Sequence, residues 1–263
     1  MIVIYLFVGV FTGLLAMLFG FGGGSVVVPI LFWLLPLHGV AIDLAMHVAI
    51  GTSLMLMLIN MVYTTALHFR SQNLDIPLLK QMLPLLILGA IFGASTASMI
   101  DSQWLRYIFM TLIGLVLLRT IKQEFFKKDS SVARKPSKTT LRILSLITGT
   151  IASLLGIGGS VIIVPFFRYY RVPMNKVSGL ANALAIPSGV VGSIIFALAG
   201  SQETHLPPYS TGYIYWPAVL GIFIGSTLGV KIGGYLSKIM PDILYGKIYA
   251  LLLLLVFISM ALH

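Results

Sequence analysis

Long apolar runs occupy nearly the whole chain and are separated by short polar gaps. Ten of these runs are candidate membrane spans, and they cover Ile2–Phe19, Val26–Val40, Leu44–Leu67, Leu78–Ile100, Leu105–Ile121, Leu141–Leu155, Val161–Phe167, Val177–Ala199, Tyr213–Leu236 and Ile243–Leu262. Several approach the roughly 20 residues that an α-helix needs to cross about 30 Å of hydrocarbon. The runs that begin at Val26 and Val161 are short, and each follows a cluster of glycines. The pattern predicts an all-α integral membrane protein.

Composition excludes a soluble globular domain. Hydrophobic residues make up 58% of the 263 positions and charged residues 9%, whereas a soluble domain has roughly 25% charged residues. Because the chain has no cysteine, disulfides, thiolate metal sites and thiol catalysis are excluded. The first apolar run starts at Ile2 with no basic segment before it, so we expect it to stay as a span rather than to be removed as a signal peptide.

A hydrophilic segment divides the chain near its middle. It covers residues 123–140 and contains Lys127, Lys128, Arg134, Lys135 and Lys138. The flanking halves, 1–122 and 141–263, resemble each other at an offset of 136 positions, where GFGGGSVVVP at Gly20–Pro29 aligns without a gap with GIGGSVIIVP at Gly156–Pro165. In the same register, Thr12, Gly13, Gly89 and Gly93 match Thr148, Gly149, Gly225 and Gly229. This matching indicates two transmembrane repeats joined by a basic linker.

The distribution of Lys and Arg distinguishes two topologies. If each half crosses five times and the linker is cytoplasmic, sixteen of the 17 basic residues lie inside and only Arg106 lies outside. If each half crosses four times, with a re-entrant segment after the glycines, ten lie inside and seven outside. The positive-inside rule favours about ten spans in two inverted five-helix repeats, with both termini outside. Eight spans, four in each half, are the alternative.

The same distribution explains the net charge of +10 without a nucleic-acid partner, since the basic residues cluster in loops that orient a membrane protein. Inverted repeats are typical of secondary transporters, whose binding site lies at the repeat interface near the middle of the membrane. The central part of each half is therefore the place to look for candidate site residues.

The two glycine clusters predict such a site. Unwound backbone at membrane depth is tolerated where it lines a cavity or is buried in protein, and we expect a new helix to begin near Ser25 and another near Ser160. The first amides of a helix lack an intrahelical partner and carry partial positive charge, so they bind anions without a cationic side chain. The predicted anion pocket is lined by Gly22, Gly23, Gly24, Ser25, Gly158, Gly159 and Ser160. Alternatively, the glycines only allow close helix packing, which is our interpretation of Gly89, Gly93, Gly225 and Gly229.

Polar residues within the spans supply further candidates. The donors that could bind oxyanion oxygens are His47, Thr52, Ser53, Asn182 and Ser188. The plainer alternatives are hydroxyl groups that bond to their own helix and, for His47, an ordinary interhelical hydrogen bond. We expect the other histidines, His38, His68, His205 and His263, in loops or at a terminus.

Several functional classes are disfavoured. The acidic residues fall in predicted loops or at span ends, and they are Asp43, Asp75, Asp101, Glu124, Asp129, Glu203 and Asp242. This argues against a cation transporter, which commonly places a carboxylate within the membrane. The chain has no Walker-type loop, HExxH or intramembrane acid pair, so we expect no enzymatic activity. No cofactor is expected either, since a bis-histidine haem needs two histidines at matching depth.

The chain resembles the sulfite exporter TauE/SafE family. The resemblance rests on the two glycine motifs, on AIGTSL at Ala49–Leu54 and on LGAIFGA at Leu88–Ala94, and it covers almost the whole chain. It implies export of sulfite or organosulfonates across the inner membrane of a bacterium. The second half departs from the first, because Gly51 is matched by Pro187 and Ser53 by Gly189. Thr52 and Ser53 are therefore better candidates than Ser188.

Three functions stay open. The leading hypothesis is a secondary transporter that works by alternating access, with the lipid bilayer and a small sulfur-containing anion as partners. Protons are a candidate coupling ion, carried by His47 or by the substrate itself. The alternatives are a passive anion channel and a membrane subunit or haem module of a redox system.

Overall fold

The computed structural model describes residues 2–20, 23–125 and 136–261, which are almost entirely helical. The described residues form ten α-helices, which are α1 Ile2–Phe19, α2 Gly24–Leu34, α3 Ile42–Arg70, α4 Ile76–Met99, α5 Ser102–Phe125, α6 Lys138–Leu155, α7 Ser160–Tyr169, α8 Met174–Ala199, α9 Trp216–Ile239 and α10 Asp242–Ala261. Two short 3₁₀ helices, Pro36–His38 and Gly200–Gln202, and two paired strands, β1 Ser210–Thr211 and β2 Ile214–Tyr215, complete them. Each predicted apolar run contains one of the α-helices or most of it, so the helical prediction is confirmed.

Six helices are long and apolar enough to cross a membrane, and they cover Ile42–Arg70, Ile76–Met99, Ser102–Lys122, Met174–Gln202, Trp216–Ile239 and Leu244–Ala261. The helices next to the two glycine clusters are shorter, and α2 and α7 have only 11 and 10 residues. These lengths identify a multi-pass membrane protein. The number of crossings, ten or eight, stays a prediction.

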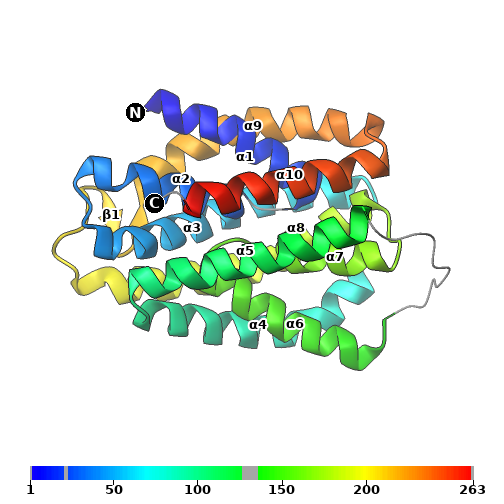
Figure 1. Cartoon of the computed structure of the whole chain (residues 1–263), viewed down its shortest axis with the longest axis horizontal. Coiled ribbons are helices and arrows are strands. Elements are labelled where there is room, and N and C mark those ends of the chain that lie inside the picture. Colours follow the sequence, from blue (N-terminus) through cyan, green and yellow to red (C-terminus); the bar gives the residue numbers. More distant parts are fainter. Residues whose placement is uncertain (1, 21–22, 126–135, 262–263) are drawn as a thin grey trace.

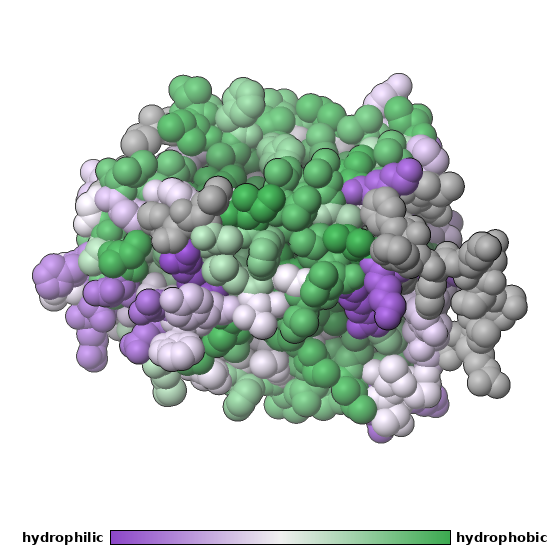
Figure 2. All heavy atoms as spheres, viewed as in Figure 1, coloured by the Kyte–Doolittle hydropathy of each residue, from purple (hydrophilic) through white to green (hydrophobic). Residues whose placement is uncertain are grey.

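Most helices run along the long axis of the molecule (Figure 1). The start of α1 and the end of α10 lie at one end, called the end of the termini, and the end of α5 and the start of α6 lie at the other, called the linker end. At the end of the termini, the Trp33 indole donates a hydrogen bond to the Ser259 carbonyl (3.0 Å), and the Arg106 guanidinium donates to the Met260 carbonyl (2.8 Å). Hydrophilic residues gather at both ends of the face in Figure 2, and hydrophobic residues cover the middle. Large hydrophobic side chains are exposed, among them Phe92 and Leu118 with 65% and 67% of their area exposed. Such a belt fits a lipid environment.

Two seams of small residues join the halves of the chain. Helix α1 packs on α9, where a Cβ added to Gly229 would overlap the Val10 carbonyl oxygen. Helix α4 packs on α6 in the corresponding way, and a Cβ at Gly93 would overlap the Thr150 carbonyl oxygen. Gly89 and Gly225 face backbone at similarly short range. The interpretation of these four glycines as packing residues is therefore confirmed, and the seams resemble small-residue contacts between other membrane helices.

Helix limits differ from the predicted ones at two turns. The run expected over Val26–Val40 ends as an α-helix at Leu34, because Pro36 has no N–H to continue the helical hydrogen bonds, and a 3₁₀ turn closed by Gly39 (φ 80°) follows. The run expected from Tyr213 becomes helical only at Trp216, since Tyr213 and Tyr215 belong to the hairpin of β1 and β2. Pro217 lies in the first turn of α9, where its missing N–H is tolerated.

The prediction that His68 lies in a loop is wrong. Helix α3 continues past Leu67 to Arg70, and a left-handed residue at Gln72 (φ 55°) follows its end. His68 is therefore helical, and only 2% of its surface is exposed. The positive φ at Gln72 is uncommon for a residue with a Cβ, so no glycine or proline signals the end of the helix in the sequence.

The small-residue seam gives a direct test in helix α9. Gly229→Ala should lower the free energy of unfolding by about 1–3 kcal/mol, because the new Cβ forces α1 and α9 apart. Gly234→Ala is the matched control, since the nearest atom to its added Cβ is Met17 Cε at 3.8 Å. Thermal denaturation of the detergent-solubilised variants measures both effects. Equal shifts for the two substitutions would contradict the close approach.

Candidate functional site

Both glycine clusters interrupt the helical backbone inside the protein. Helix α1 ends before Gly20 (φ 71°) and α6 ends before Gly156 (φ 66°), and both glycines adopt the left-handed conformation that a Cβ disfavours. The chain restarts as α2 at Gly24 and as α7 at Ser160, as the sequence predicts within one residue. Gly22 lies outside the described residues.

The two interruptions contact each other. A Cβ added to Gly24 would overlap the Gly156 carbonyl oxygen, so the start of α2 lies directly against the break in the second half. The Ser53 hydroxyl of α3 donates a 2.7 Å hydrogen bond to the same carbonyl. The break in the first half faces α8, since a Cβ at Gly20 would lie 3.0 Å from Asn182 Oδ1. Segments more than a hundred residues apart thus meet at one buried place.

Each restart presents amides without an intrahelical partner. The first hydrogen bonds of α2 run from the Val26 and Val27 amides to the Gly23 carbonyl. Those of α7 run in the same way from residues 162 and 163 to the Gly159 carbonyl. The amides just before them, at Gly24, Ser25, Ser160 and Val161, belong to the part of a helix that has no carbonyl to bond to. These amides carry the positive end of the helix dipole.

Several buried side chains near these starts have no hydrogen-bond partner. They are the Ser25 and Ser160 hydroxyls, both atoms of the Asn182 amide, and the Thr148 hydroxyl. Asn182 and Ser160 have no exposed surface, and Ser25 has 1%. Leaving such a group unpaired costs about 1–3 kcal/mol. Their burial therefore indicates that a ligand or water supplies the missing partners.

The structure brings some of the predicted site residues together and separates others. Near the breaks lie Gly23, Gly24, Ser25, Ser53, Gly158, Gly159, Ser160 and Asn182. The Thr52 hydroxyl instead accepts a 2.9 Å hydrogen bond from the Tyr215 amide in the hairpin. The His47 ring stacks near Tyr213, with centroids 5.1 Å apart. The Ser188 backbone carbonyl accepts from the Ser153 hydroxyl of α6 at 3.3 Å. Thr52 and His47 thus fix the hairpin to α3.

The sequence reading missed one buried histidine and one polar pair. The ring of His68 is buried and lies 3.3 Å from the Cβ position of Gly179 on α8. Asn60 Oδ1 accepts a 2.6 Å hydrogen bond from the Ser226 hydroxyl, which links α3 to α9. The one sequence feature that could have indicated the burial of His68 is Gly179, because a glycine on the facing helix leaves room for a ring. Among the described residues, no group of three His, Cys, Asp or Glu side chains could hold a metal ion.

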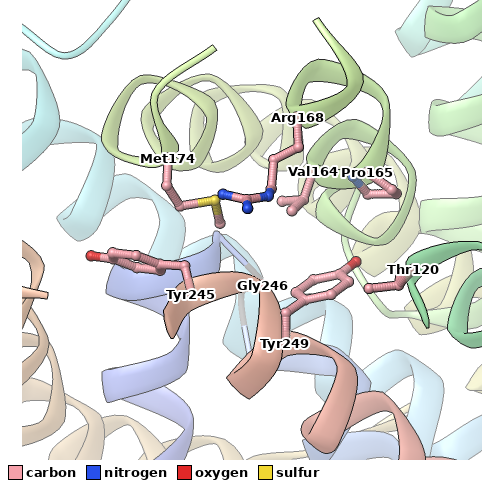
Figure 3. A pocket seen from close by; sticks show the side chains of 8 residues that line it. All are labelled: Thr120, Val164, Pro165, Arg168, Met174, Tyr245, Gly246 and Tyr249. Atoms are coloured by element: carbon pink, nitrogen blue, oxygen red, sulfur yellow. The ribbon is translucent and has the colours of Figure 1, made fainter. Parts of the chain in front are cut away.

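A small cavity lies between α5, α7 and α10, at the far end of α7 from its start (Figure 3). The Arg168 side chain extends over Tyr245 and Tyr249, and the Thr120 hydroxyl, which has no hydrogen-bond partner, lines the other side. The cavity measures about 10 Å³, which is near the smallest volume that holds one water molecule. It has no room for an anion with several oxygens.

Comparison with known proteins gives a family match over nearly the whole chain. The model of the family described as "Sulfite exporter TauE/SafE" matches residues 5–260. No solved structure matches the chain.

Curated relatives cover the chain at moderate identity. A "Probable membrane transporter protein" of Haemophilus influenzae is 32% identical over 98% of this chain and 97% of its own length. A relative with the same description from Methanocaldococcus jannaschii is 28% identical over 88% of this chain and 85% of its own. "Probable membrane transporter protein YunE" of Bacillus subtilis is 24% identical, over 97% and 95% of the two chains.

Unpaired and paired polar groups at the breaks should respond differently to substitution. Asn182→Leu should leave the free energy of unfolding unchanged or raise it, because the ligand-free amide has no partner to lose. Ser53→Ala should lower it by about 1 kcal/mol, because the Gly156 carbonyl loses its donor. Thermal denaturation without added anion measures both. A large loss of stability in the Asn182 variant would show that its amide is a structural group.

Proposed function

Because this chain belongs to the sulfite exporter TauE/SafE family, we propose that it exports a small sulfur-containing anion, sulfite or an organosulfonate. It acts as a secondary transporter by alternating access. The anion binds where the start of α2 lies against the break that precedes α7, between Gly23, Gly24, Ser25, Gly158, Gly159 and Ser160, with Asn182 and Ser53 beside them. The other candidates lie further along α3 and α8 and support the site from outside it; they are Thr52, His47 and Ser188.

One observation carries the proposal, namely that the two glycine breaks contact each other and carry unpaired donors. Each helix start carries partial positive charge, and the buried Ser25 and Ser160 hydroxyls have no hydrogen-bond partner among the described residues. In the described part of the chain no Asp, Glu, Lys or Arg side chain is buried. Neutral donors without a fixed positive charge suit a carrier, which must release its anion again.

The arrangement of the ends supports two inverted five-helix repeats. The end of α2 meets the end of α10 through Trp33 and Ser259. The end of α7 lies at the opposite end of the molecule, where Arg171 and Lys138 line a common cavity. Both short helices therefore lead from the centre to a surface, rather than returning to the side from which the preceding helix came. The matching seams α1–α9 and α4–α6 fit the same twofold relation.

Orientation follows from this arrangement and the charges. The linker and the basic ends of α3, α5, α7 and α9 face the cytoplasm of a bacterial inner membrane, and both termini face outward. Arg106 is the exception among the 17 basic residues, and it lies at the end of the termini. An export direction then takes the anion from the linker end to the end of the termini.

Anion flux in proteoliposomes tests the function. Sulfite and a short organosulfonate should show saturable flux, and sulfate and a carboxylate should compete weakly. Ser25→Ala and Asn182→Ala should each lower the ratio of maximal flux to KM at least about tenfold, since a hydrogen bond to a charged group contributes about 1.5–3 kcal/mol. Thr96→Ala is the control, because its hydroxyl bonds only the Phe92 carbonyl of its own helix.

The outcomes separate the alternatives. Flux that rises linearly with concentration would favour a passive channel. No flux of any anion in the wild type would contradict transport, and a visible haem band in the purified protein would favour the redox subunit. Unchanged flux in both the Ser25 and Asn182 variants would place the binding site elsewhere. An imposed pH gradient in the same assay shows whether protons are coupled.

A further inference from the structure

A cavity of about 680 Å³ opens at the linker end of the molecule, between α4, α6 and the turn from α7 to α8. Its rim carries Asp75, Lys138, Arg171 and Lys176. Its floor is apolar and consists of Leu141, Phe167, Val177 and Leu180, which are at most 5% exposed. The volume lies in the range of about 300–1,000 Å³ that is usual for small-molecule sites.

The charges on the rim favour an anion. Among the described lining residues, three side chains are cationic and one is a carboxylate, Asp75, which caps α4 by accepting a 3.0 Å hydrogen bond from the Leu78 amide, so the lining keeps a net positive charge. A recess with a net positive charge above an apolar floor concentrates anions. The effect weakens with salt, because the Debye length is about 8 Å at physiological ionic strength.

Arg171 closes the end of α7, where its amide donates to the Arg168 carbonyl and the Val172 amide donates to the Phe167 carbonyl. Arg171 has a φ of 57° in the turn that joins α7 to α8, a conformation that a Cβ makes unfavourable and that glycine adopts freely. A left-handed residue is common at a helix end closed by these bonds, and here it sets the place on the cavity rim from which the Arg171 side chain extends. Gln72 has the same conformation (φ 55°) in the turn from α3 to α4, but it is not part of the cavity lining.

We propose that this cavity is a vestibule that binds oxyanions through Lys138, Arg171 and Lys176 before they reach the glycine breaks. The assignment rests on the proposed function for its role in transport. The vestibule and the breaks share helix α8, where Leu180 of the floor precedes Asn182 by two residues. The chemistry it recognises is a sulfonate, sulfite or phosphate group, supplied either by a dissolved anion or by a lipid headgroup.

The natural lack of cysteine makes a direct test available. Gln81→Cys places a single thiol in the vestibule lining, and Ser71→Cys places one on exposed surface outside that lining. The full-length protein in phosphatidylcholine nanodiscs is treated with two methanethiosulfonate reagents, one bearing a sulfonate and one a quaternary ammonium. The ratio of the anionic to the cationic reaction rate should be at least about threefold higher at position 81 than at position 71.

Substitution of the rim then assigns the effect to its residues. Arg171→Gly, in the Gln81→Cys background, should lower the rate ratio about threefold through loss of one nearby charge. Its thermal midpoint should stay the same or rise, because glycine relieves the backbone. Gln72→Gly should have the same effect on stability and leave the ratio unchanged. Lys176→Gln, which does not touch the strained position, should also lower the ratio.

Protection distinguishes the sources of the anion. Ethanesulfonate that slows labelling at position 81, but not at position 71, identifies a site for dissolved anions. Slowing by phosphatidylglycerol in the nanodisc, without an effect of ethanesulfonate, identifies a lipid-headgroup site. Equal rate ratios at the two positions, or no change in Arg171→Gly and Lys176→Gln, would overturn the vestibule. Labelling does not require transport. The absence of flux in proteoliposomes would therefore contradict the proposed function without contradicting the vestibule.

Discussion

Backbone polar groups within a membrane need hydrogen-bond partners, and the contact between the two glycine breaks depends on this constraint. An interruption in lipid would leave amides and carbonyls without water. Here each break is enclosed by the other half of the chain, and the Gly156 carbonyl receives the Ser53 hydroxyl. One carbonyl at the breaks is therefore satisfied by a side chain of the protein, whereas the first amides of α2 and α7 have no intrahelical partner. The proposed anion site depends on this asymmetry.

The seams of small residues explain how the two halves of the chain hold the breaks in place. Helices α1 and α9 approach so closely that no Cβ fits at Gly13 or Gly229, and α4 and α6 do the same. Each seam joins one helix from each half, so each break is fixed to partners from the other half. Each break therefore lies at the interface between the halves, which is where secondary transporters with inverted repeats have their binding sites.

Much of this arrangement is predictable from the sequence, because long apolar runs and clustered glycines are local signals. The positions of ten helices and of both breaks follow from them. The depth of His68 does not, since the end of α3 is set by a left-handed Gln72 that no breaker residue announces. The partners of Thr52 and His47 cannot be predicted from local signals either, because the hairpin residues Tyr213 and Tyr215 lie over 160 positions away. Contacts between distant segments depend on packing that a one-dimensional pattern does not contain.

The central claim, that the substrate lies between the starts of α2 and α7, is tested most directly by locating a bound anion. Selenite is the heavier congener of sulfite, and its selenium gives an anomalous diffraction signal in crystals of the protein. The account predicts one strong peak within hydrogen-bonding distance of the amides at Gly24 and Ser160 and of the Asn182 amide. A peak at another place in the membrane region, or none between the breaks at saturating selenite, would contradict it.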